Sequence, residues 1–327
     1  MRRLLTCELG KPKRIIVFSR DETKQHYMRL DYLNRQYATD DIIYHNFQEL
    51  LTFRIGDIRD FHSVAAVMRE ADVVFHAAAL KQVPTCEYFP FEGVQTNIIG
   101  AENLVRAIKE YQLAVDTVVG VSTDKACKPV NVMGMTKAIQ ERIFIKANIE
   151  CCGVRFICVR YGNVLASRGS VIPLFHEQIR RGGPVTITTP EMTRFLLSLD
   201  QGVDTIFAAL HGAKRGETYI PRIQSARVVD VADVLIGDRP VKKTYTSIRP
   251  GEKVHEILVS EEEINRTVKR GAYFTMKPAL PELAESSQDE PILTHEFSSA
   301  DNLMTKKQLE VLLRKHHLMV EDNIKYE

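Results

Sequence analysis

Runs rich in apolar and β-branched residues recur through the first half of the chain, and segments with helical periodicity separate them. The runs cover residues 14–18, 51–55, 73–76, 117–121 and 155–159. The segments 97–108 and 132–148 place apolar residues at three- and four-residue spacing, which predicts helices. Continuous rather than alternating apolar runs indicate strands that are buried on both faces, as in a parallel sheet covered by helices. We therefore predict an α/β protein built on a parallel sheet.

The pattern changes after Tyr161, where the expected elements become shorter. Gly182-Gly183-Pro184 and Arg249-Pro250-Gly251 interrupt them, which is typical of turns. The polar stretch 285–290 predicts a surface loop, and a last helix is expected over 305–316. We predict a sheet domain over 1–165, a smaller second domain over 166–283 with some elements returning to the sheet, and a C-terminal loop and helix over 284–327.

The composition excludes several classes of protein. The 327 residues are 44% hydrophobic, which is enough for a sizeable core. Lys and Arg number 44 against 42 acidic residues, so no basic excess indicates a nucleic-acid partner. No apolar run approaches the ~18 residues that span a bilayer. The six cysteines lack metal-ligand spacing, and adjacent Cys151 and Cys152 make a poor disulfide framework. We expect reduced thiols, no metal site and a cytoplasmic location.

The densest group of reactive side chains lies in the segment STDKACKPVNVMGMTK, residues 122–137. Its reactive members are Thr123, Asp124, Lys125, Met133 and Lys137. The first three follow a strand-like run and present a hydroxyl, a carboxylate and an ammonium together, while the last two share one face of the next helix. Polar groups at the carboxyl end of a parallel strand form active sites in open α/β sheets. The competing interpretation of Asp124 and Lys125 is a surface ion pair worth under ~1 kcal/mol.

Polar or small side chains also follow the three earlier strand-like runs. They are Ser19, Arg20 and Asp21, then Asp57 and Ile58, then Ala77, Ala78 and Lys81. In a dinucleotide fold the residue at such a strand end contacts the adenosine ribose, and an arginine there can neutralise a 2′-phosphate. Small residues let a cofactor approach the backbone closely. Taken singly, each group is also explained by a polar turn, a helix cap or helix–sheet packing.

In this order the motifs resemble those of the extended short-chain dehydrogenase/reductases. Within that group the chain is similar to the nucleotide-sugar 4,6-dehydratases of bacterial polysaccharide biosynthesis, which act on UDP-N-acetylglucosamine. The matching stretches are FSRDETKQ (18–25), GDIRD (56–60), FHAAALKQVP (75–84), TNIIGAENL (96–104), STDKACKPVNVMGMTK (122–137), RYGNVLASRGSVIPLF (160–175), MTRF (192–195) and IRPGEKVHEIL (248–258). The resemblance implies a Rossmann-like cofactor domain followed by a smaller C-terminal domain that binds the UDP-sugar.

The resemblance implies NADP, or NAD, as the cofactor. Its contacts would be Ser19, Arg20 and Asp21 at the adenosine ribose and 2′-phosphate, Asp57 and Ile58 at the adenine, Ala77, Ala78 and Lys81 along the cofactor, and Lys137 at the nicotinamide ribose. The positive charge of Lys137 would lower the pKa of nearby proton donors.

The resemblance also implies an internal redox cycle. A hydride leaves C4 of the sugar for the cofactor, the ketone acidifies the C5 proton, water is eliminated across C5 and C6, and the hydride returns to C6. Asp124 would be the acid at the C6 hydroxyl, Lys125 the base at C5, and Thr123 a contact of the C4 hydroxyl. For this role burial would have to depress the pKa of Lys125.

Met133 stands where the wider superfamily has the tyrosine of a Tyr-x-x-x-Lys pair, four residues before Lys137. A thioether cannot take a proton from the C4 hydroxyl. Several dehydratases of this group resemble the chain in having methionine here, so Met133 favours a dehydratase and would act through shape and packing. The alternatives are a UDP-sugar epimerase and a non-catalytic UDP-sugar-binding protein.

Six residues of the second half would contact the UDP-sugar by the same resemblance. They are Asn163, Arg168, Ser170, Arg194, Arg249 and Glu252. Arg194 and Arg249 would hold the diphosphate, because guanidinium groups bind phosphate in a bidentate way. Glu252 would accept from a ribose hydroxyl, although a solvated loop carboxylate explains it nearly as well. A homo-oligomer is expected by analogy with the family alone.

No Gly-x-x-Gly-x-x-Gly turn follows a first strand in this sequence, although backbone amides of such a turn hold the pyrophosphate in dinucleotide folds. Residues 1–6 resemble the end of the helix after that turn, so we expect the first strand to be missing and a seam of unpaired backbone groups in the sheet. A start codon assigned roughly 20 to 25 residues too late, which we favour, and a broken gene are the two explanations. Either predicts weak NADP binding.

Overall fold

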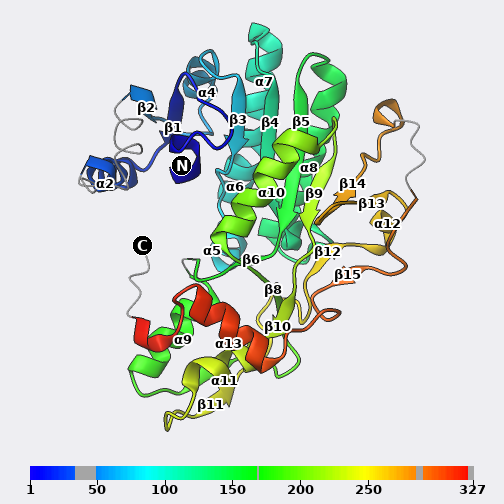
Figure 1. Cartoon of the computed structure of the whole chain (residues 1–327). Coiled ribbons are helices and arrows are strands. Elements are labelled where there is room, and N and C mark those ends of the chain that lie inside the picture. Colours follow the sequence, from blue (N-terminus) through cyan, green and yellow to red (C-terminus); the bar gives the residue numbers. More distant parts are fainter. Residues whose placement is uncertain (34–48, 168, 285–289, 323–327) are drawn as a thin grey trace.

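The computed structural model describes residues 1–33, 49–167, 169–284 and 290–322. Its centre is a six-stranded sheet in the order β13-β14-β9-β5-β4-β3 (Figure 1). The strands are β3 (Val73–His76), β4 (Thr117–Thr123), β5 (Arg155–Tyr161), β9 (Thr218–Pro221), β13 (Thr267–Arg270) and β14 (Tyr273–Met276). Strands β3, β4, β5 and β9 are parallel, and β14 and β13 extend them in antiparallel fashion. The predicted α/β class with a mainly parallel sheet is confirmed.

Helices cover both faces of the large sheet because its central strands are apolar on both faces. Val118 and Phe156 point to one side, and their neighbours Val119 and Ile157 point to the other. The helices on the first side are α4 (Phe61–Met68), α7 (Gly100–Tyr111) and α8 (Val132–Glu150), and α10 (Leu199–Gly212) lies on the second. The chain reaches α7 through α5 (Val83–Tyr88), α6 (Pro90–Gly93) and the π-helix η1 (Val94–Ile99).

The first two strands of the chain form a separate unit, which we call the β1–β2 pair. Strands β1 (Ile15–Ser19) and β2 (Leu51–Ile55) pair in parallel, and in the described part of the chain neither pairs with β3, the edge strand of the large sheet. Helices α1 (Arg2–Leu5) and α2 (Glu22–Leu33) contribute to an apolar cluster that holds the pair. Figure 1 shows the pair at the β3 end of the large sheet, so the expected seam is present there.

The second half of the chain adds a layer of helices and short strands, in the lower part of Figure 1. Phe175, Leu235 and Leu309 are fully buried in its apolar core. Its elements are β6 (Asn163–Val164), α9 (Val171–Arg180), β7 (Val185–Ile187), β8 (Thr193–Leu197), β10 (Ser225–Arg227), α11 (Val228–Ile236), β11 (Lys243–Tyr245), α13 (Lys306–Lys315) and η4 (Val320–Asp322). Between them and the large sheet lie β12 (Ile257–Val259) and β15 (Phe297–Ser298). Helix α12 (Glu261–Ile264) lies beside β13 and β14, and η3 (Pro281–Leu283) packs against Gly216 just before β9.

A buried ionic network joins the large sheet to the second half. The side chain of Arg160 on β5 is 2% exposed and bridges Glu141 on α8, at 2.6 Å, and Glu263 on α12, at 2.7 Å. Arg160 also donates to the carbonyl of Leu258 at 3.0 Å, and the Ser122 hydroxyl donates to Glu141. Burial raises the pKa of Glu263, but the charge of Arg160 outweighs burial and lowers that pKa to about 2. These contacts fix β4, β5, α8 and α12 relative to one another.

Among the helices described here, none is both long and apolar enough to cross a membrane. The same residues bring together no group of three or more side chains suited to hold a metal ion.

Candidate active site

Strand β4 delivers the central motif to the carboxyl edge of the sheet, where the 3₁₀ helix η2 (Asp124–Ala126) follows it. The side chain of Asp124 is 0% exposed. Its Oδ1 accepts hydrogen bonds from Thr123 Oγ1 at 2.8 Å and from Lys125 Nζ at 3.0 Å. Its Oδ2 is buried without a hydrogen-bond partner, and a Cβ on Gly162 would lie 3.3 Å from it. Because buried polar atoms are nearly always paired, this oxygen indicates a group that a ligand completes.

Close backbone packing holds α8 against η2. Asn131 caps the helix by accepting from Gly134 N at 2.8 Å, and its amide donates to the Gly251 carbonyl at 2.7 Å. A Cβ on Gly134 would overlap the carbonyl oxygen of Lys125, so any side chain there would push the helix away. The glycine inside the motif is therefore required to keep the methionine–lysine face of α8 beside the acid–base pair.

Met133 and Lys137 both lie on the inner face of α8, each 5% exposed. Lys137 Nζ donates to the Val121 carbonyl at 2.5 Å and to Gln140 Oε1 at 2.6 Å. Burial lowers the pKa of Lys137 to about 8. The position of the superfamily tyrosine thus holds a buried thioether. The lysine four residues later donates to β4 two residues before Thr123.

Lys125 does not have the depressed pKa expected for a base. Burial lowers the pKa of Lys125, but the carboxylates of Asp124 and Glu256 outweigh burial and raise it above its ordinary value. With 21% of the lysine side chain and 0% of the aspartate exposed, the pair is not the surface ion pair of the competing interpretation. The resting site therefore holds an ammonium and a carboxylate, largely shielded from solvent.

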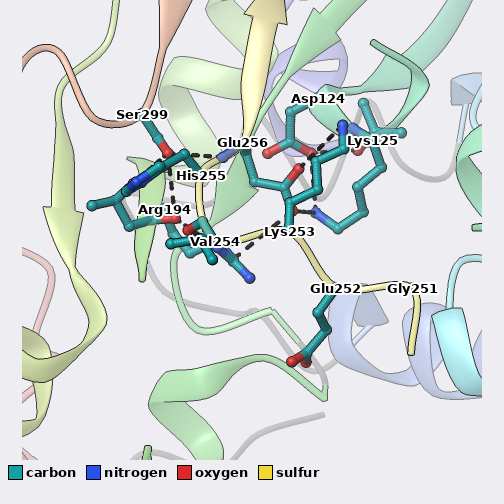
Figure 2. Close-up of polar contacts among 12 residues, drawn as sticks. Asp124, Lys125, Arg194, Gly251, Glu252, Lys253, Val254, His255, Glu256 and Ser299 are labelled. Atoms are coloured by element: carbon teal, nitrogen blue, oxygen red, sulfur yellow. Dashed lines mark hydrogen bonds and ion pairs between the residues drawn. The ribbon is translucent and has the colours of Figure 1, made fainter. Parts of the chain in front are cut away.

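Glu256 and Lys253, which are not among the expected site residues, complete this polar cluster (Figure 2). Glu256 Oε1 lies 3.5 Å from Lys125 Nζ, and Lys253 Nζ donates to the Cys127 carbonyl at 2.6 Å. Both come from the segment before β12, more than a hundred residues after Asp124. The available sequence signal is an acidic residue placed directly before the apolar run 257–259, at the end of the stretch IRPGEKVHEIL.

The residues expected to bind substrate on β8 and in the turn before β12 differ in whether they face the polar cluster. Arg194 is turned inward, with 12% of its side chain exposed, and donates to the carbonyls of Thr193 at 2.7 Å and Val254 at 3.1 Å. Arg249 is exposed, and its backbone amide donates to Glu252 at 3.4 Å. Figure 2 shows Glu252 pointing away from the cluster. The structure therefore brings Arg194, but neither Arg249 nor Glu252, into the polar cluster, where it lies 3.9 Å from Glu256.

Two further expected substrate residues carry buried oxygens without partners. These are Asn163 Oδ1 on β6 and Ser170 Oγ at the start of α9. Asn163 directly follows Gly162, the residue that borders Asp124. Arg168 lies outside the described residues. Unpaired polar atoms on the segment beside Asp124 are suited to a hydroxyl-rich ligand.

The residues expected at the adenosine end meet at the carboxyl ends of β1 and β2. Arg20 Nη1 lies 3.6 Å from Asp57 Oδ2, and 56% of the Arg20 side chain is exposed. Asp57 also accepts from Arg59 at 2.7 Å, and this hydrogen bond lowers the pKa of Asp57. Ser19 Oγ accepts from the amide of Asp21 at 3.0 Å. Arg20 is open to a ligand, whereas both carboxylate oxygens of Asp57 accept from Arg59 and Ser19 serves the turn into α2.

Ile58 is turned towards the helices rather than to the open strand edge expected for an adenine contact. A Cβ on Gly100 of α7 would lie 2.9 Å from Ile58 Cγ1, so the two are in tight contact. Asn103 donates to the Ile58 carbonyl at 2.9 Å. Ile58 therefore packs the helix layer in this structure.

The end of β3 offers small exposed side chains and one unmarked histidine. Ala77, Ala78 and Lys81 are exposed in the loop after the strand. His76 is buried, its Nε2 has no partner, and burial with the nearby charge of Lys137 lowers the pKa of His76 to about 3. The ends of β1 to β4 thus fit the two ends of a dinucleotide: an exposed arginine for a phosphate, small residues for close approach, and a buried lysine. In the described residues no glycine-rich turn lies between β1 and β3.

The fold and the strand-end site define a Rossmann-like α/β protein of the epimerase/dehydratase type. Residues 1–278 match the sequence profile of the family described as polysaccharide biosynthesis protein, and the chain belongs to that family. Its fold is the one that solved nucleotide-sugar epimerases and dehydratases share.

The chain resembles both solved and curated proteins over most of its length. Pen from Bacillus thuringiensis is 31% identical and superposes with a TM-score of 0.84 over 97% of this chain and 93% of Pen. A UDP-glucose 4-epimerase of Rickettsia akari is 42% identical over 266 residues, 80% of this chain and 73% of the relative. An uncharacterized membrane protein of Methanocaldococcus jannaschii is 45% identical over 236 residues, 68% of this chain and 70% of that protein. DesIV, a dTDP-glucose 4,6-dehydratase of Streptomyces venezuelae solved with NAD and TYD, shares the fold at 21% identity and a TM-score of 0.63, over 77% of this chain and 81% of DesIV.

Proposed function

We propose that this protein is a UDP-N-acetylglucosamine 4,6-dehydratase that uses NADP and supplies a UDP-4-keto-6-deoxy-N-acetylhexosamine for surface polysaccharide synthesis. The observation that carries the proposal is the buried Asp124–Lys125 pair, with the unpaired Oδ2 of Asp124, beside a thioether in the tyrosine position. Hydride transfer at C4 alone does not need such a pair. Elimination of water needs an acid and a base within reach of adjacent carbons.

One proton transfer converts the resting ion pair into an acid and a base. Lys125 Nζ donates to Asp124 Oδ1 across 3.0 Å, and movement of that proton leaves a neutral amine and a protonated carboxyl. The amine then takes the C5 proton, and the Asp124 carboxyl protonates the C6 hydroxyl, which leaves as water. The Lys125 ammonium later returns its proton to C5. The proton released from the C4 hydroxyl, which Thr123 would contact, then restores the Lys125 ammonium. No proton is gained or lost over the cycle.

The cofactor would lie along the carboxyl ends of β1 to β4. When bound, NADP accepts the hydride from C4 and returns it to C6. Arg20 would hold the 2′-phosphate and Asp57 the adenine, since both are at the strand ends and Arg20 is well exposed. Ala77 and Ala78 would allow close approach, with Lys81 beyond them, and Lys137 would hold the nicotinamide ribose.

The UDP-sugar would lie on the side of the second half. Asn163 and Ser170 have unpaired oxygens for sugar or ribose hydroxyls. The exposed guanidinium of Arg249 suits the diphosphate, with Glu252 near a ribose hydroxyl. Arg194 faces Glu256 and two carbonyls, so its role would be to order the acid–base cluster rather than to bind phosphate directly.

A UDP-sugar 4-epimerase is the second candidate, because several relatives carry that name, including the Rickettsia akari protein. An epimerase oxidises and reduces the same carbon and has no water to eliminate. Met133 cannot exchange a proton with the C4 hydroxyl, and the buried Asp124–Lys125 pair would have no elimination to perform. Both observations favour the dehydratase.

The test is proton NMR of UDP-N-acetylglucosamine incubated with the protein and excess NADP⁺. A new C6 methyl signal with a C4 ketone is expected, and Asp124→Asn and Lys125→Met are expected to slow its appearance by about 10²-fold or more. Lys128→Met is the matched control, since this neighbouring lysine pairs with Glu296 at 2.7 Å outside the cluster. A C4 epimer without a methyl signal would overturn the proposal in favour of the epimerase. Binding of the sugar without turnover would favour a non-catalytic protein.

A further inference from the structure

Glu256 lies in an environment that its local sequence does not explain. Its side chain is 3% exposed, and its Oε2 has no hydrogen-bond partner. Three cations face the carboxylate: Lys125 at 3.5 Å, Arg194 at 3.9 Å and Lys253 at 4.0 Å. Figure 2 shows it between Lys125 on one side and Arg194 on the other. A buried carboxylate without close hydrogen bonds is costly, so its charge has to be balanced by these neighbours.

The backbone of Glu256 holds that carboxylate in place. Its amide donates to Ser299 Oγ at 2.9 Å, and the Ser299 amide donates back to the Glu256 carbonyl at 2.8 Å. The Ser299 hydroxyl also lies 2.6 Å from Thr193 Oγ1 on β8. Two separate segments of the second half therefore clamp the residue, so its charge meets the Asp124–Lys125 pair at a set distance.

Charged groups from several elements surround Lys125. Asp124 on its own loop and Glu256 from the β12 segment favour the ammonium, whereas Arg194 from β8 opposes it. Lys253, which shares Glu256, adds a further positive charge. Opposite charges within about 4–6 Å favour the charged form of a group. When Asp124 carries the proton, as the proposed elimination requires, Glu256 is the remaining carboxylate of this set that faces Lys125.

We propose that Glu256 is a positioning residue that holds Lys125 as an ammonium next to Asp124, and so sets the pH above which the pair loses its shared proton. The role of Glu256 in catalysis rests on the proposed function, but its effect on the protonation of Lys125 can be measured without turnover. The proton moves from Lys125 Nζ to Asp124 Oδ1, and the charge of Glu256 opposes that movement. The cations Arg194 and Lys253 face the same carboxylate, so they weaken the effect of Glu256 on this proton transfer.

The direct test is trace acetylation with acetic anhydride, read at Lys125 by mass spectrometry and normalised to surface lysines. Only the neutral amine reacts, and 21% of the Lys125 side chain is exposed to so small a reagent. In Glu256→Gln the pKa of Lys125 is expected to fall by on the order of one unit. At a fixed pH of about 9 that fall raises acetylation of Lys125 roughly tenfold, because one unit is a tenfold change in the neutral fraction. Glu261→Gln, an exposed carboxylate of α12 that faces Lys128 instead, is the matched control and should leave Lys125 unchanged.

Equal acetylation of Lys125 in the wild-type protein and in a folded Glu256→Gln variant would overturn the inference. If that variant does not fold, Glu256→Asp keeps the charge but withdraws it by one methylene, and it should give an intermediate reactivity. Unchanged reactivity in a folded Asp variant would count equally against the inference. In an active enzyme, Glu256→Gln should also move the falling limb of the pH–rate profile, where Lys125 loses its proton, to lower pH. Absence of turnover in the wild type would contradict the proposed function and leave the acetylation result standing.

Discussion

The six-stranded sheet and the β1–β2 pair carry the two halves of one proposed site, but different forces hold them. The sheet is covered on both faces, and the network of Arg160 with Glu141 and Glu263 ties it to the second half from inside. The β1–β2 pair rests on a small apolar cluster around Leu5. Its ionic ties to the rest are exposed ones, such as those that Glu70, after α4, makes to both strands.

This difference matches the different tasks of the two regions. In the proposed mechanism Lys125 and Lys137 need pKa values set by burial and fixed charges, which the covered sheet and the clamped β12 segment provide. Arg20 and Asp57 would only have to hold one end of a cofactor. A two-stranded sheet is marginally stable by itself, so we expect the β1–β2 pair to open more readily than the catalytic half.

The largest effect should follow from removal of the buried cation. Arg160→Met leaves Glu141 and Glu263 buried without their shared partner, and the loss of one member of a buried ion pair costs about 3–5 kcal/mol. Urea unfolding followed by circular dichroism would measure the loss. Arg155→Met on the same strand is the matched control, since 28% of that side chain is exposed and it donates to neutral oxygens. A loss below about 1 kcal/mol for Arg160→Met would mean that the network does not hold the sheet to the second half.

A smaller and local effect is expected at the other region. Leu5 of α1 is 0% exposed in the cluster beneath the β1–β2 pair, and truncation of a buried leucine to alanine costs about 2–5 kcal/mol. We expect Leu5→Ala to remove amide hydrogen-exchange protection from residues 15–19 and 51–55, and to leave 117–123 and 155–161 protected. The measurement is hydrogen exchange followed by mass spectrometry.

Leu313→Ala on α13 is the matched control for this experiment. Leu313 is also 0% exposed, but it belongs to the core of the second half. Its truncation should lower protection around α9 and α11 and spare the β1–β2 pair. If Leu5→Ala instead lowered protection equally in all strands, the two regions would unfold as one unit and the comparison between them would fail.

The sequence predicts those features of the molecule that neighbouring residues in the chain determine, and it does not predict those that depend on contacts between distant segments. The early strands follow from continuous apolar runs, so β2 of the β1–β2 pair and β3 of the large sheet match the predicted ranges, and β4 and β5 extend two residues beyond them. The acid–base pair follows from one short motif at a strand end. In both cases neighbouring residues in the chain carry the signal.

Glu256 and Ile58 show why the rest is not predictable in this way. Glu256 reaches Lys125 because the segment before β12 returns to the sheet, and its carboxylate adds to that of Asp124 in raising the pKa of Lys125. The side chain of Ile58 faces the helices because Gly100 of α7 leaves room for it. Each outcome depends on a contact between elements far apart in the chain, which local motifs do not encode.

The smallest effect should come from the exposed ionic tie between the two regions. Glu70 accepts from Arg14, just before β1, and lies 3.4 Å from Arg54 on β2, with 35% of its side chain exposed. Pairs this exposed contribute about 0–1 kcal/mol and are screened by salt. Glu70→Gln should therefore change the protection of the β1–β2 pair slightly at low salt and not at all in 1 M salt, near a Debye length of about 3 Å.

The matched control for that change is Glu110→Gln, which removes a similar exposed pair with Arg106 at 2.6 Å within α7 alone. It should leave the β1–β2 pair untouched at any salt concentration. A large, salt-independent loss of protection in Glu70→Gln would show that charge, rather than the apolar cluster around Leu5, holds the pair to the molecule. The contrast between a region fixed by buried charge and one fixed by apolar packing would then have to be abandoned, because both would depend on ionic contacts.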